Sequence, residues 1–348
     1  MTALERLQQT GIRRSRAGKG FVFRTARGGP MPASEVARIR KLAIPPAWTE
    51  VHVAPSATAK LQAVGKDKAG RWQYRYHPQF RRRQERRKFR KLVDFADALP
   101  RMRKRVARDI RSRGLGRDRV LACAIRVLST CFLRPGSDEY ARRHRHYGLT
   151  TLRNEHVTVK GDRVTFDYPG KSGQRQHRAI RDRSVASIVR AMKKLPGKEV
   201  FKFVADDEAV VDVKRDHLND YIKSVMGPDF TAKDFRTWAG TLICACALAR
   251  VAEVDEELRA TPKKALRKKA VRKKVVEAVK ETAAELGNTP AVCKSSYIEP
   301  SVLSSFEKGE VVEKYFDKVE ELVEHTEAKL AGPEKALKEL LEASTEPV

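Results

Sequence analysis

The sequence has no long hydrophobic run, because nothing in its 348 residues approaches the roughly 18 apolar residues that a membrane-spanning helix needs. The longest candidate, residues 238–249, is shorter and carries small residues. The N-terminus also lacks the apolar core of a secretory signal, since Glu5 is followed by Arg13, Arg14 and Arg16. We therefore expect a cytoplasmic protein with no membrane partner.

Cysteine is scarce, and its pattern is that of a reduced protein. The five cysteines are odd in number and scattered, which is typical of cytosolic chains. Cys244-x-Cys246 could begin a zinc site, but no second Cys or His pair stands nearby to complete four ligands. Buried apolar thiols are the interpretation that we favour. The residues are Cys123, Cys131, Cys244, Cys246 and Cys293.

Motifs for cofactors are incomplete. The Gly170-Lys171-Ser172 sequence suggests a phosphate-binding loop, but Thr165 stands where that fingerprint requires glycine. The acidic cluster at residues 206–208 has no second carboxylate pair for Mg²⁺, which favours a solvated loop. His144-x-His146 lies among arginines, which would repel a cation. We predict no metal and no nucleotide cofactor.

Acidic residues are too few to balance the basic ones. Lys and Arg number 73 against 44 Asp and Glu, which gives a formal charge of +29. The imbalance is concentrated before residue 307, because residues 307–348 hold 12 acidic and 6 basic side chains. Such a charge predicts a polyanionic partner, since each neutralised phosphate releases counterions.

The pattern of apolar residues predicts an α+β chain of two domains. The first, residues 1–84, is β-rich, with short strands near residues 21–23, 51–53 and 71–76 and a helix near residues 33–42. The second, residues 85–348, is mainly helical and ends in an acidic helical tail, residues 307–348. The basic stretch at residues 80–91 is expected to be a solvated hinge or a helix start.

Within the helical domain one region reads as strands. Residues 157–160 and 163–168 flank a Gly161-Asp162 turn, and a third strand follows near residues 176–178. This pattern predicts a three-stranded meander with Lys171 at its second turn. The predicted helical segments are residues 90–112, 117–133, 137–148, 182–193, 213–225, 233–250 and 262–286, and amphipathic helices broken at Gly332-Pro333 are expected near the C-terminus.

A dispersed set of polar residues suits one reaction, the metal-free transesterification of a phosphodiester. A tyrosine can attack phosphorus if guanidinium groups stabilise the added charge and a lysine protonates the departing oxygen. Spacing alone does not assign these roles, because in so basic a chain any one residue could be a solvated charge or a simple phosphate contact. The set is Arg134, Lys171, Arg236, Asn288 and Tyr297.

Five stretches carry a resemblance to a known family. They are residues 73–76 (QYRY), 133–157 (LRPGSDEYARRHRHYGLTTLRNEHV), 170–173 (GKSG), 231–241 (TAKDFRTWAGT) and 286–300 (LGNTPAVCKSSYIEP). In order, spacing and context they resemble the small, monomeric type IB DNA topoisomerases of bacteria and poxviruses. The resemblance implies two lobes that close as a clamp around duplex DNA, with a catalytic domain like that of the tyrosine recombinases. It also implies relaxation of positive and negative supercoils through a 3′-phosphotyrosyl intermediate, strand rotation and religation, without ATP or metal.

The same resemblance assigns the site residues. Tyr297 is expected to be the nucleophile, Arg134 and Arg236 to bind the scissile phosphate, and Lys171 to be the general acid. Asn288 is expected to bind a non-bridging oxygen. Poxvirus-like members carry His there, and Asn can donate a neutral hydrogen bond but adds no charge.

Further residues resemble DNA contacts of the family. In the N-terminal domain these are Gln73, Tyr74 and Tyr76, for which the alternative is that they are ordinary residues of an edge strand. In the second domain they are Tyr140, whose alternative is helix packing, and Lys233, which lies one helical turn from Arg236.

Two other functions compete with this interpretation. A tyrosine recombinase shares the chemistry, but recombinases usually have His-x-x-Arg where this chain has Lys233-x-x-Arg236, and their N-terminal domain is helical. A non-catalytic basic DNA-binding protein would explain the charge but not the ordered set of residues. We therefore predict a monomeric enzyme that acts on double-stranded DNA, located in the cytoplasm with the nucleoid.

Overall fold

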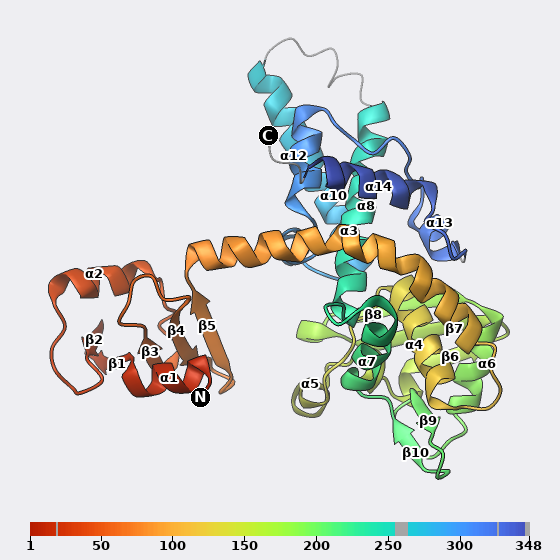
Figure 1. Ribbon diagram of the computed structural model, residues 1–348, viewed down its shortest axis with the longest axis horizontal. Helices are drawn as coiled ribbons and strands as arrows, with labels where there is room; N and C mark the ends of the chain where they lie inside the picture. The colour runs from red at the N-terminus through yellow and green to blue at the C-terminus, as the bar shows by residue number, and fades with distance from the viewer. Residues whose placement is uncertain (19, 255–263, 326, 345–348) are drawn as a thin grey trace. The chain divides into compact units, whose positions relative to one another are not determined.

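The computed structural model describes residues 1–18, 20–254, 264–325 and 327–344. The chain divides into two compact units, Met1–Lys88 and Phe89–Val348, and each is described by itself. Both contain helices and antiparallel sheets, so the predicted α+β class is confirmed (Figure 1). The clamp around DNA stays a prediction.

The first unit is built on a five-stranded antiparallel sheet in the order β2-β1-β3-β4-β5. Three of these strands and helix α2 were predicted, whereas β1, β4 and α1 were not. Four of the six residues in the IRRSRA sequence of β1 are polar, so it lacks the apolar alternation that marks a half-buried strand. The elements are α1 (Ala3–Thr10), β1 (Ile12–Ala17), β2 (Gly20–Arg24), α2 (Ala33–Lys41), β3 (Thr49–Val53), β4 (Leu61–Lys66) and β5 (Trp72–Tyr76).

The helix α3 (Pro78–Asp109) contains the basic stretch at residues 80–91, so the expected helix start is confirmed. The predicted helical segments of the second domain all correspond to helices, although residues 262–263 lie outside the described part. The helices after α3 are α4 (Arg117–Cys131), α5 (Asp138–His144), α6 (Arg183–Met192), α7 (Arg215–Met226), α8 (Ala232–Val254), α10 (Lys264–Leu286), α11 (Pro290–Ser296), α12 (Pro300–Lys308), α13 (Val319–Glu324) and α14 (Gly332–Ala343).

The second unit also holds the predicted meander, with antiparallel strands in the order β6-β7-β8. Its bounds are β6 (Val157–Lys160), β7 (Arg163–Pro169) and β8 (Arg175–Arg181). A hairpin of β9 (Lys202–Val204) and β10 (Val210–Asp212) was not predicted, and its turn holds the acidic residues 206–208. These residues are exposed, as expected for a solvated loop.

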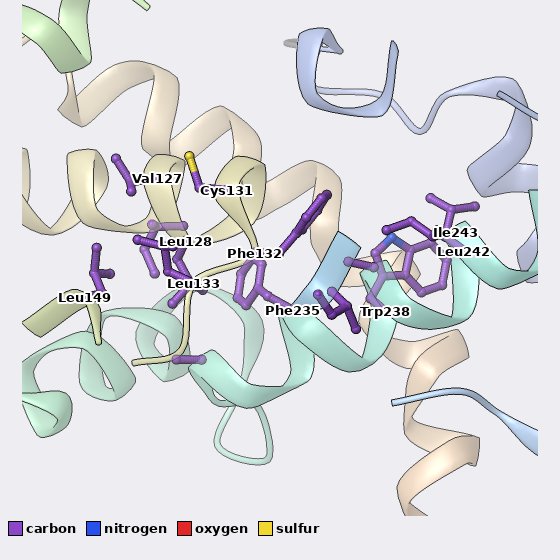
Figure 2. Close-up of a cluster of buried hydrophobic side chains, with 14 of the residues drawn as sticks. Val127, Leu128, Cys131, Phe132, Leu133, Leu149, Phe235, Trp238, Leu242 and Ile243 are labelled. Carbon is purple, nitrogen blue, oxygen red and sulfur yellow. The ribbon is translucent and has the colours of Figure 1, made fainter. Parts of the chain in front are cut away.

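The core of the second unit packs α4 against α8. Figure 2 shows Phe132, just after α4, beside Phe235 of α8, and both side chains are buried. The ring of Phe95 from α3 meets the edge of Phe235 at 5.0 Å between centroids and lies 6.0 Å from Trp238. Each fully buried side chain of this size contributes about 1.5–3 kcal/mol. This packing fixes the start of α8, which carries two of the predicted site residues.

The acidic C-terminal segment also packs on this core. Glu334 of α14 is fully buried and accepts hydrogen bonds from both terminal nitrogens of Arg103, at 2.9 and 2.8 Å. The indole of Trp238 donates to the same carboxylate at 3.3 Å. The segment is therefore held to the basic body by a buried ion pair.

The five cysteines are free and buried, which confirms the predicted apolar thiols. Burial raises the pKa of the Cys131 and Cys244 thiols to about 12, and that of Cys246 and Cys293 to about 11. Within the described ranges there is no group of three or more metal-ligating side chains. None of the described helices is long and apolar enough to cross a bilayer.

Candidate active site

One cleft of the second unit gathers six of the predicted residues. Its volume is about 570 Å³, and its walls come from the loop after α4, from α5, the β7–β8 connection, α7, the start of α8 and the residue after α11. The six are Arg134, Tyr140, Lys171, Lys233, Arg236 and Tyr297. Asn288 lies beside the cleft, where its side-chain oxygen accepts a hydrogen bond from Arg134. The remaining three predicted residues belong to the first unit.

Arg134 is presented by a turn that ends α4. Phe132 adopts the left-handed conformation, with φ of 52°, and stops the helix. The Leu149 N–H then donates to the Arg134 carbonyl at 2.8 Å. Gly148 makes this approach possible, because a Cβ there would lie 2.7 Å from the Arg134 carbonyl oxygen and from the backbone of Gly136. The backbone of Arg134 is thus held while its side chain lines the cleft.

Arg236 enters the cleft from α8 and is only 2% exposed. The beginning of this helix is fixed by Asp234, whose Oδ2 accepts from the backbone N–H and the hydroxyl of Thr231 at 2.8 and 2.9 Å. Lys91 pairs with the same carboxylate oxygen at 2.9 Å. Burial lowers the pKa of the Arg236 guanidinium. The cap therefore sets the direction in which both Lys233 and Arg236 leave the helix.

The C-terminal end of α10 binds three guanidinium groups. Arg178 donates to the carbonyls of residues 284 and 285 at 3.1 and 2.7 Å. Arg236 donates to the carbonyl of residue 286 at 2.8 Å, and Arg134 donates to the carbonyl of residue 287 at 3.0 Å. Carbonyls at this end of a helix lack intrahelical partners and carry the negative end of its dipole. Cationic side chains are therefore stabilised at this helix end by carbonyl oxygens.

Tyr297 follows α11, and its phenol lies near several positively charged side chains. The guanidinium carbon of Arg236 is 5.0 Å from the centre of the Tyr297 ring. Burial alone would raise the pKa of the Tyr297 phenol, but the charge and hydrogen bonding of Arg236, with the charges of Arg134 and Lys233, lower it below its ordinary value. A lowered pKa makes the phenol oxygen a better nucleophile near neutral pH.

The Tyr297 backbone is held against α8. The hydroxyl of Thr241 donates to the Tyr297 carbonyl at 3.2 Å. A Cβ on Gly240 would lie 2.8 Å from that carbonyl oxygen and 3.0 Å from the Tyr297 Cβ, so only glycine permits this contact. Helix α8 thus fixes the nucleophile candidate and Arg236 together.

Lys171 lies at the second turn of the meander, as the sequence predicted, and opens a short 3₁₀ turn at Lys171–Gly173. The Gly170 N–H donates to the Gln174 carbonyl at 2.8 Å, and the Gly173 N–H donates to the Gly170 carbonyl at 3.1 Å. The side chain of Lys171 is exposed and lines the cleft. A closed turn carries a flexible ammonium group toward the other site residues.

Two buried donors of the site have no hydrogen-bond partner among the described residues. They are Nε of Arg236 and Nδ2 of Asn288. A buried donor without a partner costs roughly 1–3 kcal/mol, so native proteins rarely keep one without a functional reason. Both donors belong to residues that the sequence had assigned to phosphate binding.

Sequence reasoning missed several residues of the cleft. His146 was considered only as a metal ligand, yet it lines the cleft with Lys171, and its ring lies 5.8 Å from that of His144. Arg215 and Asn219 come from α7, which no motif had marked. The available signal for His146 was its place inside the stretch 133–157, between Arg134 and the predicted meander.

The three predicted residues of the first unit lie on β5, the edge strand of its sheet. Tyr74 and Tyr76 are 42% and 41% exposed, and their rings stack at 6.2 Å. Strand alternation places Gln73 on the opposite face, where its amide donates to Asp67 at 3.0 Å. The two tyrosines thus form an exposed aromatic pair, and Gln73 already has a partner within its own unit.

Comparison with known proteins gives the family. Residues 77–326 match the model of the eukaryotic DNA topoisomerase I catalytic core, and residues 20–67 match that of the bacterial DNA topoisomerase IB N-terminal domain. DNA topoisomerase 1B of Acanthamoeba polyphaga mimivirus is 33% identical over 304 residues, which cover 86% of this chain and 88% of that protein. DNA topoisomerase 1B of vaccinia virus (strain Copenhagen) is 22% identical over 78% of this chain and 81% of that protein.

The chain therefore belongs to the type IB DNA topoisomerases, of the small bacterial and viral type. Its activity is the relaxation of supercoiled DNA, and the resemblance drawn from the five sequence stretches is confirmed. Its substrate is DNA, as the basic charge predicted. The two competing functions, recombinase and non-catalytic binding protein, are not the ones that the comparisons support.

Proposed function

We propose that Tyr297 cleaves one DNA strand by attacking a backbone phosphate. The phenol oxygen forms a bond to phosphorus while the bond from phosphorus to the 5′ oxygen breaks, which leaves a 3′-phosphotyrosyl ester and a free 5′ hydroxyl. The phenol proton passes to solvent, and the departing 5′ oxygen takes a proton from Lys171. One phosphoester replaces another, so religation is the reverse step and needs no nucleotide. The lowered pKa of Tyr297 supports its role as nucleophile.

Arg134, Arg236 and Asn288 bind the non-bridging oxygens of the same phosphate. The observation that carries this assignment is the pair of unpartnered donors, Nε of Arg236 and Nδ2 of Asn288, found within the described part of the chain. Phosphate oxygens are the acceptors that such donors lack, and charge-assisted hydrogen bonds strengthen as the transition state gains charge. Guanidinium groups thereby do the work that a metal ion does in other phosphoryl-transfer sites.

The remaining predicted residues bind DNA away from the reacting phosphorus. Lys233 and Tyr140 contact the backbone near the scissile phosphate, and Tyr74 and Tyr76 contact the duplex through the first unit, together with Gln73 once it leaves Asp67. The exposure of the two tyrosines supports this role. The enzyme acts as a monomer without metal or nucleotide, relaxes supercoils of both signs by strand rotation, and works in the cytoplasm on the nucleoid.

Covalent mapping tests the nucleophile. Denatured cleavage complexes digested with protease should carry the 3′ end of DNA on Tyr297, and plasmid relaxation should proceed in EDTA without ATP. Tyr297→Phe should abolish cleavage while duplex binding persists, because binding depends on phosphate contacts. A 5′ linkage, a different tyrosine or loss of all activity in EDTA would contradict the proposal.

The general acid is tested with a substrate whose bridging 5′ oxygen is replaced by sulfur, which leaves as a thiolate without protonation. Lys171→Ala should slow cleavage of normal DNA by about 10²–10⁴-fold and cleave the sulfur substrate nearly normally. Arg134→Ala and Arg236→Ala should stay slow on both substrates, because they act on the non-bridging oxygens. A Lys171→Ala variant that sulfur does not rescue would show that Lys171 only binds phosphate.

A further inference from the structure

Gln176 of β8 fills the space between two parts of the candidate active site. It is only 7% exposed, which is unusual for a long polar side chain. A Cβ on Gly170 would lie 2.7 Å from its Cγ, and a Cβ on Gly287 would lie 2.1 Å from its Oε1. Gly170 directly precedes Lys171, and Gly287 directly precedes Asn288. The Gln176 side chain therefore stands between the backbone that carries the lysine and the backbone that carries the asparagine.

Hydrogen bonds tie Gly287 to a site residue and tie Gly170 into the turn that carries another. The Gly287 carbonyl accepts from Arg134 at 3.0 Å, and Gly287 adopts a φ of +58°, which favours glycine. On the other side, Nε2 of Gln176 lies 3.4 Å from the Gln174 carbonyl, which also accepts from the Gly170 N–H at 2.8 Å. A change at Gln176 would thus be transmitted to the lysine turn and to the end of α10.

A second residue holds the middle of the same strand. Arg178 lies two positions along β8, on the same face, and donates to the carbonyls of Ala284 and Glu285 at 3.1 and 2.7 Å. If Gln176 is shortened, Arg178 still docks the strand on α10. The loss of contact is then confined to the end of the hairpin that carries Lys171.

We propose that Gln176 is a positioning residue that sets the distance between Lys171 and the phosphate-binding end of α10, an assignment that rests on the proposed roles of Lys171 and Asn288. The lysine must reach the bridging 5′ oxygen while Arg134 and Asn288 hold non-bridging oxygens of the same phosphorus. A displacement of about 1 Å can cost about 10²-fold in rate. The Gln176 side chain, which lies between the two glycines, therefore holds Lys171 at a fixed distance from the residues that bind the phosphate.

The test is single-turnover cleavage of the normal and the 5′-sulfur substrates at saturating enzyme. Gln176→Ala should be slower on normal DNA by about 10–100-fold and should recover most of that loss on the sulfur substrate. The matched control is Gln174→Ala, which truncates the same residue type at an exposed position of the same hairpin and should cleave both substrates like the wild type. Lys171→Ala is the reference for rescue by sulfur.

Gln176→Asn guards against misfolding, because it keeps a buried amide but is one methylene too short to reach Gly287. It should show the same selective loss, smaller in size, with a thermal melting midpoint close to the wild type. An equal loss on both substrates, or no loss with either variant, would overturn the positioning role. Failure of sulfur to rescue Lys171→Ala would overturn the general-acid proposal and the positioning role with it. Rescue of Lys171→Ala but not of Gln176→Ala would overturn the positioning role alone.

Discussion

The second unit uses arginine in two different ways. Arg103 and Arg105 bind carboxylates, Glu334 at 2.8 Å in the C-terminal helix and Asp109 at the end of α3. Arg134 and Arg236 instead bind amide oxygens at or beside the ends of α4 and α10, and Arg236 also hydrogen-bonds the phenol of Tyr297. An arginine neutralised by a carboxylate stabilises the fold, whereas one held by carbonyls keeps its charge for an incoming anion.

The pKa values of the two kinds of arginine differ in direction. Hydrogen bonding to Asp109 raises the pKa of Arg105, while burial lowers that of Arg236. A buried charge without an opposite charge is costly, and the dipole of α10 offsets part of that cost. Replacing the amide partner of Arg134 by a carboxylate should therefore change the activity. Replacing the carboxylate partner of Arg105 by an amide should instead change the stability.

The largest effect is expected from Asn288→Asp, which places a carboxylate where Arg134 now binds an amide oxygen. The new ion pair neutralises Arg134 and repels the scissile phosphate, so the cleavage rate should fall by about 10³-fold, equivalent to about 4 kcal/mol. Single-turnover cleavage measures the rate, and the thermal midpoint should not fall. Asn288→Ala is the control and should lose less, since it removes a donor to the phosphate and an acceptor for Arg134 but adds no negative charge. Equal rates for the two variants would refute the distinction between the arginines.

The converse change, Asp109→Asn, should cost stability rather than activity. Asp109 is 7% exposed and accepts from Arg105, Arg108 and the Tyr221 hydroxyl, the last at 2.8 Å. Removing the charge of a buried pair costs about 3 kcal/mol, measurable by urea denaturation. Asp118→Asn, at the half-buried second partner of Arg105, should cost less than about 1 kcal/mol. Comparable losses for the two variants would show that burial does not matter here.

Acidification offers an independent check on Asp109. Burial alone would raise the pKa of this carboxyl, but hydrogen bonds from Arg105, Tyr221 and Arg108 lower it below its ordinary value of 3.8. Its contribution is fully present above that value and is lost as the pH falls through the lowered pKa of the folded state. The difference in unfolding free energy between wild type and Asp109→Asn should shrink on acidification, and a constant difference would speak against the ion pair.

A smaller loss is expected at the C-terminal helix. Glu334→Gln keeps an acceptor for Arg103 but removes the charge, and should lower the unfolding free energy by about 2 kcal/mol. The exposed Glu339 of the same helix provides the control, and Glu339→Gln should leave stability unchanged. Urea denaturation of both variants decides the matter, since equal midpoints would mean that the buried pair adds nothing.

The smallest effect concerns the field around Tyr297. The exposed Lys233 helps to lower the Tyr297 pKa, so Lys233→Ala should raise that pKa and move the rise of cleavage rate with pH toward higher pH. At pH 7 the rate on the sulfur substrate should drop by about threefold, in line with roughly 0.2–1 kcal/mol for an exposed charge. A pH profile that does not move would show that Arg236 and Arg134 alone lower the pKa of Tyr297.

The sequence by itself determined those features of the protein that follow from local residue patterns. The helices of the second unit follow from apolar periodicity, and the meander follows from two short strands around Gly161, whose φ is +58°. The candidate residues were found because each stands inside a recognisable stretch. Among the unpredicted strands, β1 is mostly polar and β9 and β10 have three residues each, so their formation depends on neighbours that local patterns do not reveal.

Only the tertiary structure decided how these residues act together. Arg134, Arg178 and Arg236 come from separate elements, and no spacing along the chain indicates that they meet at one helix end. The burial of Gln176 depends equally on two glycines far apart in the sequence. Hydrogen bonds and close packing act over a few ångströms in space, so the chemistry of each residue was readable from the chain but its partners existed only once the chain had folded.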